Sequence, residues 1–179
     1  MKKHILHDEI GNLLKSFNNA KAGISILLDP ACSGKEHIPL FDSEHKSRST
    51  RLCCIDAGII KNGELLGLIE IEESGFLPTK ICGKFLTSAF STHLIRGSKV
   101  PPPVSISSSS FFVQIVDISS LEDKSSKPDQ YNHIQSSIKK LITNSDFRIK
   151  EYTLFQVPRG PEHMDKIKKI IDYIAYKLA

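Results

Sequence analysis

Apolar positions recur along the chain with two periods, one typical of helices and one typical of strands. Spacings of three and four residues put Ile10, Leu13, Leu14 and Phe17 on one face, which predicts an amphipathic helix over residues 8–17. Helical spacing also predicts helices over residues 77–95, 129–143 and 161–178. Proline near the start of the second and fourth segments suits the first turn of a helix.

Short apolar runs between these helices predict strands over residues 23–29, 51–60, 64–73, 111–118 and 152–157. Residues 30–50 and 97–110 are rich in Pro, Ser and other polar residues, so they are predicted to be loops. A hairpin followed by alternating strands and helices predicts an α/β (α+β) fold with a mixed central β-sheet flanked by helices. The length suits one domain over residues 1–179.

Composition limits the classes of protein to which the chain can belong but does not identify a function. The 179 residues carry a net charge of +4, which permits a polyanionic partner without requiring one. No apolar run approaches the roughly 20 residues of a membrane span, and the first ten residues lack the apolar stretch of a signal peptide. We therefore expect a cytoplasmic protein that does not insert into membranes. The four cysteines have no zinc-knuckle spacing and are expected to be reduced.

The segment GLIEIEE carries acids where a strand ordinarily has apolar or β-branched residues. Residues two apart in a strand point to the same face, so Glu70 and Glu72 should lie side by side, with Ile69 and Ile71 on the other face. A solvated strand face is the simplest interpretation of these acids. Asp56 lies within the apolar run CCIDAGII, where an acid is usually paired or functional.

The turn between the two strands decides whether the three acids meet. If Asn62 and Gly63 form a two-residue turn, Lys61 pairs with Glu64 and Asp56 faces away from the other two acids. If the loop also includes Lys61, or if the hairpin contains an equivalent bulge, Asp56 shares their face. Three convergent carboxylates repel one another unless a cation lies between them. We favour the second register, with Mg²⁺ or Mn²⁺ as the cation.

An Asp in one hairpin strand followed by Glu-x-Glu in the next resembles the PD-(D/E)XK nucleases, the restriction-endonuclease-like superfamily. The matching residues are Asp56, Glu70 and Glu72, and Ile55 stands where the motif has proline. The expected order of elements from residue 8 to about residue 117 also resembles the helix–three strands–helix–strand core of that superfamily. The resemblance covers about two-thirds of the chain. It implies a metal-dependent endonuclease.

The resemblance also implies roles for individual residues. Asp56, Glu70 and the carbonyl of Ile71 would bind the metal ion, and Glu72 would bind a second ion or act as the base. Because Glu72 stands where the family usually has lysine, the positive charge is expected from the next helix, with Lys80 as the catalytic residue and Lys84 as its alternative. The family often adds an acid from its first helix. Either Glu9 or Glu36 would fill that place, and the sequence does not decide between them.

The expected substrate is nucleic acid, with duplex DNA favoured over RNA. Lysine and arginine side chains provide most contacts to phosphates. The segment HKSRSTR leads into the Asp56 strand, so Lys46, Arg48 and Arg51 are the expected contacts, together with Lys84. A small nuclease that cuts both strands is expected to form a homodimer, by analogy only.

Two other functional classes fit the same residues. In the first, the chain has the same fold but is catalytically inactive because of Glu72, and it binds nucleic acid or protein. In the second, it is an unrelated α/β domain whose acidic strand binds another protein.

Overall fold

The computed structural model describes residues 4–19, 22–73, 77–97, 102–121 and 126–179. Within these residues the α-helices are α1 (Ile5–Leu14), α2 (Pro78–Ala89), α3 (Lys127–Thr143) and α4 (His163–Leu178). The strands are β1 (Ile24–Leu28), β2 (Ile38–Phe41), β3 (Arg51–Ile55), β4 (Ala57–Lys61), β5 (Glu64–Glu72), β6 (His93–Leu94), β7 (Val104–Asp117) and β8 (Ile149–Val157). Short 3-10 turns, η1 (Lys15–Phe17) and η3 (Pro30–Cys32), complete the description.

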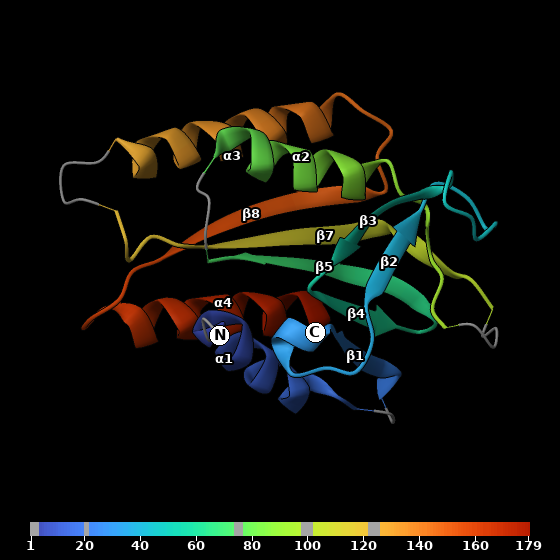
Figure 1. Cartoon of the computed structure of the whole chain (residues 1–179), viewed down its shortest axis with the longest axis horizontal. Coiled ribbons are helices and arrows are strands. Elements are labelled where there is room, and N and C mark those ends of the chain that lie inside the picture. Colours follow the sequence, from blue (N-terminus) through green and yellow to red (C-terminus); the bar gives the residue numbers. More distant parts are fainter. Residues whose placement is uncertain (1–3, 20–21, 74–76, 98–101, 122–125) are drawn as a thin grey trace.

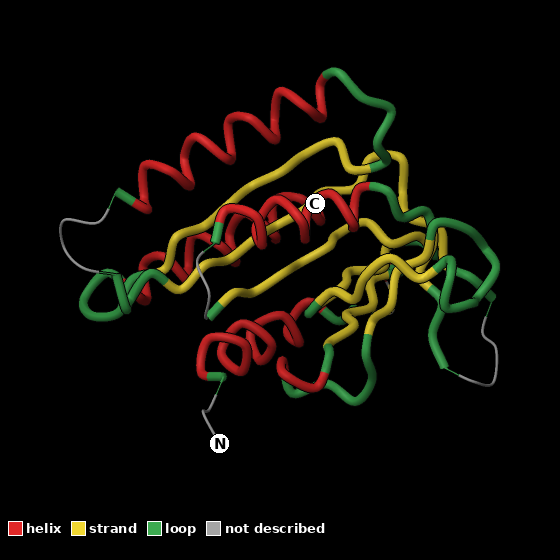
Figure 2. Tube along the Cα trace, turned by 45° about the horizontal axis from the view of Figure 1, so that its top comes forward, coloured by secondary structure: helices red, strands yellow, loops and turns green. Residues whose placement is uncertain are grey.

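The eight described strands form one mixed sheet between two layers of helices (Figure 1). Helices α2 and α3 cover one face, and α1 and α4 cover the other. Figure 2, turned by 45°, again shows α3 and α1 on opposite sides of the strands. The predicted mixed sheet with helices on both faces is therefore confirmed. No described helix combines the length and the apolar character needed to cross a membrane.

The order β1-β4-β5-β7-β8 forms the larger part of the sheet. The pairs β1–β4 and β4–β5 are antiparallel, whereas β5–β7 and β7–β8 are parallel. Parallel neighbours need a crossover connection, and α2 and α3 provide these two connections. Strand β7 is buried from Ser110 onwards, which fits its position between β5 and β8.

The remaining strands extend the sheet from the beginning of β7. Strand β7 pairs with β6, β6 with β2, and β2 with β3, all antiparallel. This extension corrects both loop predictions. The predicted loop over residues 30–50 contains β2, whose buried side chains Ile38, Leu40 and Phe41 pack in the interior. The predicted connector over residues 97–110 contains the first half of β7, where alternating serines concealed a strand.

The hairpin β4–β5 combines features of both registers considered above. Asn62 and Gly63 have φ values of 54° and 85° and form a two-residue turn, so the prediction of a three-residue loop is wrong. The ladder then shifts by one residue, because Ile60 pairs with Leu65 but Ile59 pairs with Gly67. Leu66 is thus an extra residue in β5, which is a β-bulge. The bulge puts Asp56 on the same face as Glu70 and Glu72, as predicted, whereas the two-residue turn alone would put Asp56 on the other face.

Candidate functional site

Asp56 interrupts the run that the sequence predicts as one strand. It lies between the end of β3 and the start of β4, and Ala57 after it pairs with Ile69, which puts Asp56 opposite Glu70. The Asp56 Oδ2 atom accepts a hydrogen bond from the backbone N–H of Ile71 at 2.7 Å. Asp56 is therefore fixed on β5 by the backbone beside the second acid.

Glu70 and Glu72 face the α2–α3 layer, and Ile69 and Ile71 pack in the opposite core, as predicted. The two acids are only 1% and 5% exposed, which excludes the solvated strand face. Both acids meet a lysine from α2. Lys84 Nζ donates to Glu70 Oε2, and Lys80 Nζ donates to Glu72 Oε1 at 2.7 Å. Lys80 and Lys84 are one helical turn apart, so α2 places a cation over each of the two buried acids.

The pKa values of Asp56 and Glu70 are shifted in opposite directions. Burial and the negative charge of Asp56 raise the pKa of Glu70 well above its usual range, despite the nearby Lys84. For Asp56, burial is outweighed by hydrogen bonding to His7, the charge of Lys84 and the Ile71 N–H, so its pKa is lowered. The hydrogen bond between the two carboxyl groups therefore favours the proton on Glu70 and the negative charge on Asp56.

Lys84 is the cation closest to this acid pair. Burial favours its neutral form, but the charges of Glu70 and Asp56 outweigh burial and raise the pKa of Lys84. Lys84 consequently remains an ammonium ion and neutralises one negative charge of the pair. The sequence left Lys80 and Lys84 as candidates for the relocated cation, with Lys80 preferred; in the structure Lys84 lies beside Glu70 and Lys80 beside Glu72.

The opposite face of the sheet carries a histidine that the sequence did not indicate. His7 on α1 is buried, and its Nε2 lies 3.7 Å from Asp56 Oδ2. Burial opposes the charged imidazolium, but the hydrogen bond and charge of Asp56, followed by Glu73, raise the pKa of His7. Asp56 therefore interacts with titratable groups from both helix layers, His7 of α1 and Lys84 of α2.

His7 was missed because α1 begins three residues earlier than predicted. With the helix starting at Ile5, His4 is the N-terminal cap residue and His7 follows one turn later. Their separation of three residues was the available signal, since such residues share a helix face. The predicted start at residue 8 left both histidines outside the helix.

Neither proposed upstream acid reaches Asp56 by a described contact. Glu9 Oε2 lies 2.8 Å from His163 Nε2 at the start of α4. Glu36 lines a separate surface hollow together with Lys15, Lys35 and Arg96. The first helix thus supplies the Asp56 site with an imidazole rather than a carboxylate.

Three of the four predicted nucleic-acid contacts lie away from the acids, whereas Lys84 contacts Glu70. Arg51 begins β3, five residues before Asp56, or about 16 Å along an extended chain. Its guanidinium donates to Cys54 Sγ at 2.9 Å, and Lys46 Nζ donates to the carbonyl of Gly97. Arg48 is exposed in the same loop. Their role in binding nucleic acid stays a prediction, as does the role of the Ile71 carbonyl.

Gln114 is a further buried polar residue beside the acids. It pairs with Glu70 across the parallel β5–β7 ladder and is 1% exposed. Tyr152 from β8 donates its hydroxyl hydrogen to Gln114 Oε1 at 2.8 Å. The side chain of Gln114 is thereby held in place at the base of the acid site.

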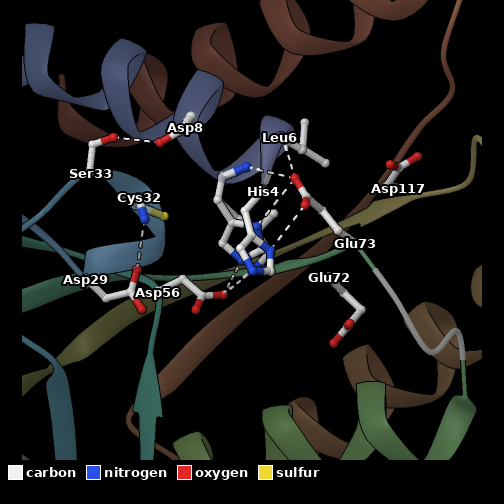
Figure 3. A network of polar contacts seen from close by, with 12 residues as sticks. His4, Leu6, Asp8, Asp29, Cys32, Ser33, Asp56, Glu72, Glu73 and Asp117 are labelled. Atoms are coloured by element: carbon white, nitrogen blue, oxygen red, sulfur yellow. Dashed lines mark hydrogen bonds and ion pairs between the residues drawn. The ribbon is translucent and has the colours of Figure 1, made fainter. Parts of the chain in front are cut away.

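Glu73 forms the other end of the network in Figure 3, where it points away from Glu72 towards the start of α1. Its Oε1 accepts hydrogen bonds from the backbone N–H groups of Leu6 and His7, the latter at 3.1 Å. His4 makes no side-chain cap of its own. Glu73 therefore caps α1 from the end of β5 and joins the helix to the sheet.

Replacing Glu73 by alanine should lower the free energy of unfolding by about 1–2 kcal/mol, because two amide donors at the start of α1 lose their acceptor. Urea denaturation measures this change. Glu64→Ala at the exposed start of the same strand is the control and should change stability by less than about 0.5 kcal/mol. Equal effects of the two substitutions would show that the cap does not stabilise the fold.

Comparison with known proteins does not assign the chain to a family. No family model, curated protein or solved structure matches the chain. The arrangement of Asp56, Glu70, Glu72, Lys80 and Lys84 is accordingly the basis for a functional proposal.

Proposed function

We propose that the protein is a divalent-metal-dependent nuclease that hydrolyses phosphodiester bonds, with DNA as its expected substrate. The observation that carries the proposal is the convergence of Asp56, Glu70 and Lys84 in a buried site at the end of the hairpin. An acid pair with an adjacent lysine resembles the reactive set of the PD-(D/E)XK nucleases. Here the lysine comes from α2 instead of the position of Glu72.

The acid pair has the chemistry of a site for a hard cation. Carboxylate oxygens are the ligands that Mg²⁺ and Mn²⁺ prefer. Burial and the neighbouring charge of Asp56 raise the pKa of Glu70, so negative charge on Glu70 is disfavoured there. A divalent cation would remove that penalty and favour the ionised form of Glu70. When bound, such an ion lowers the pKa of a water molecule and neutralises charge on a phosphate.

The residues of the chain have separate roles in this proposal. Asp56, whose pKa is already low, holds the cation together with Glu70. Lys84 stays protonated, so it stabilises negative charge on the phosphate instead of accepting a proton. Glu72 lies two residues after Glu70 in β5 and binds Lys80, which lies one helical turn before Lys84, so this second pair borders the same face.

The direct test is an assay of the full-length chain with duplex DNA, single-stranded DNA and RNA in the presence of Mg²⁺ or Mn²⁺. Cleavage of at least one substrate, abolished by EDTA and restored by added metal, is the expected result. Absence of cleavage under all these conditions would contradict the proposal.

A second candidate is the same fold acting as a non-catalytic nucleic-acid-binding module. The observation that favours it is Glu72 at the position where the family has lysine, with Lys80 already bound to it. Metal-independent binding to a labelled duplex, without cleavage, would support this module over the nuclease. Salt-dependent affinity would identify phosphate contacts.

A further inference from the structure

A second group of side chains with metal-ligating atoms lies on the other face of the sheet. His4 and His7 come from the start of α1, and Glu73 follows directly after β5. One ligand atom from each residue lies within 4.8 Å of the other two. Glu73 is 66 and 69 positions from the two histidines in sequence, but it meets them because it caps the helix start at which both lie.

The spacing of these atoms suits a tetrahedral ion. His4 Nδ1 lies 3.4 Å from Glu73 Oε2, and His7 Nδ1 lies 3.5 Å from Glu73 Oε1. Two ligands placed 2.0–2.1 Å from a tetrahedral zinc ion would be about 3.3–3.4 Å apart. Small side-chain rotations therefore bring the three residues into ligand geometry.

His7 gives an independent indication of a missing ligand. Its side chain is only 9% exposed, and its Nδ1 atom is buried without a hydrogen-bond partner. Leaving a buried polar atom unsatisfied costs free energy, and native structures rarely do so without a reason. A cation held between Nδ1 and Glu73 would satisfy this nitrogen.

The other nitrogen of His7 completes the pattern of a metal ligand. Nε2 faces the Asp56 carboxylate at 3.7 Å. Histidine ligands of metals commonly donate their second N–H group to a carboxylate, which fixes the tautomer and orients the ring. His7 thus has a ligand atom directed at one site and an orienting carboxylate on its other side.

We propose that His4, His7 and Glu73 bind a transition-metal ion of the Zn²⁺ class, separately from the Asp56–Glu70 pair. Imidazole nitrogen suits Zn²⁺, Ni²⁺ and Cu²⁺, whereas Mg²⁺ prefers oxygen. His4 is 61% exposed, so an ion can enter from solvent and keep a position for water. The site stands on its own residues and does not depend on nuclease activity.

The test uses the full-length chain without a histidine tag. Titration with Zn²⁺ by calorimetry and with Co²⁺ by visible absorption should show one site in the wild type. His4→Gln should weaken binding at least tenfold, and because His4 is exposed this variant should fold normally. His133→Gln, at an exposed histidine of α3, is the matched control and should bind as the wild type does.

A second pair of variants separates this site from the acid pair. Glu73→Gln should lose Zn²⁺ binding. Asp56→Asn should keep the Zn²⁺ site with an affinity reduced by about tenfold to a hundredfold, because Asp56 only orients His7, while losing Mg²⁺ or Mn²⁺ binding. The proposal is overturned if the wild type binds neither Zn²⁺ nor Co²⁺, or if His4→Gln binds with unchanged affinity. A thiolate-to-cobalt charge-transfer band would also overturn it, because it would place the ion on a cysteine.

Discussion

Asp56→Asn should reduce metal-dependent cleavage by about a hundred-fold to ten-thousand-fold, the rate equivalent of several kcal/mol of lost charge stabilisation. Asp56 is the acid of the pair that is charged near neutral pH, because the His7 hydrogen bond, Lys84 and the Ile71 N–H outweigh the effect of burial on its pKa. Asparagine keeps the size of the side chain and an acceptor for the Ile71 N–H. The substitution therefore removes mainly the negative charge.

The measurement is the cleavage rate at saturating Mn²⁺, together with Mn²⁺ affinity. Asp42→Asn, at an exposed acid in the loop after β2, is the control and should leave both quantities unchanged. Circular dichroism of each variant checks that the fold is intact. If Asp56→Asn cleaves at the rate of the wild type, the acid pair is not the reactive site. The cleavage would then come from another site or from a contaminant.

Lys84→Met should lower the free energy of unfolding by about 2–3 kcal/mol at pH 8. Breaking a fully buried ion pair costs about 3–5 kcal/mol, and the smaller value reflects the 30% exposure of the Lys84 side chain. Glu70 is 1% exposed and would lose its counter-ion beside Asp56. The methylene part of the side chain is retained in methionine, so packing against β5 changes little.

The loss of unfolding free energy caused by Lys84→Met should become smaller as the pH falls towards 5. Without Lys84 the pKa of Glu70 rises further, so folded Glu70 keeps a proton that the unfolded chain has released. The stability of both proteins falls as the pH rises above the ordinary glutamate range, because the unfolded state binds fewer protons, and the variant loses more because its folded state keeps the proton to a higher pH. Protonation at low pH removes the unpaired charge and most of the cost.

Lys80→Met is the matched control, since it removes a lysine from the same helix and leaves an acid of the same strand. Lys80 is 42% exposed, so solvent screening should limit its effect to less than about 1 kcal/mol. Urea denaturation of both variants at pH 5 and pH 8 makes the comparison. Equal, pH-independent losses would show that Lys84 does not compensate the buried acids.

The sequence predicted the fold class because its long elements have clear periods. Helices α3 and α4 and strands β1, β5 and β8 lie where apolar spacing placed them, within a few residues at their ends. The predicted helix over residues 77–95 is too long, because α2 ends at Ala89 and residues 93–94 form β6. Strand β2 could not be predicted in this way. Its four residues include a proline and lie among polar neighbours, so they form a strand only because β3 and β6 pair with them.

Only one part of the acid site could be predicted from the alternation of side chains along a strand. Glu70 and Glu72 share a face because they are two apart, which holds in any strand. Whether Asp56 joins them depends on the number of residues between them, and a bulge changes that number without a local signal in LLGLI. Long lysine side chains add a second limit, because sequence spacing alone did not show that Lys84 rather than Lys80 contacts Glu70.

The extra residue in β5 has a consequence for insertions and deletions. Leu65 and Leu68 both pack in the α2–α3 core although they are three positions apart, because Leu66 lies outside the regular ladder. Substituting Leu66 leaves the count of residues unchanged, so the acids keep their face. Deleting it would either force the strand out of register or turn Glu70 and Glu72 towards the layer of α4. The face on which Glu70 and Glu72 lie therefore depends more on the number of residues before them in β5 than on the identity of those residues.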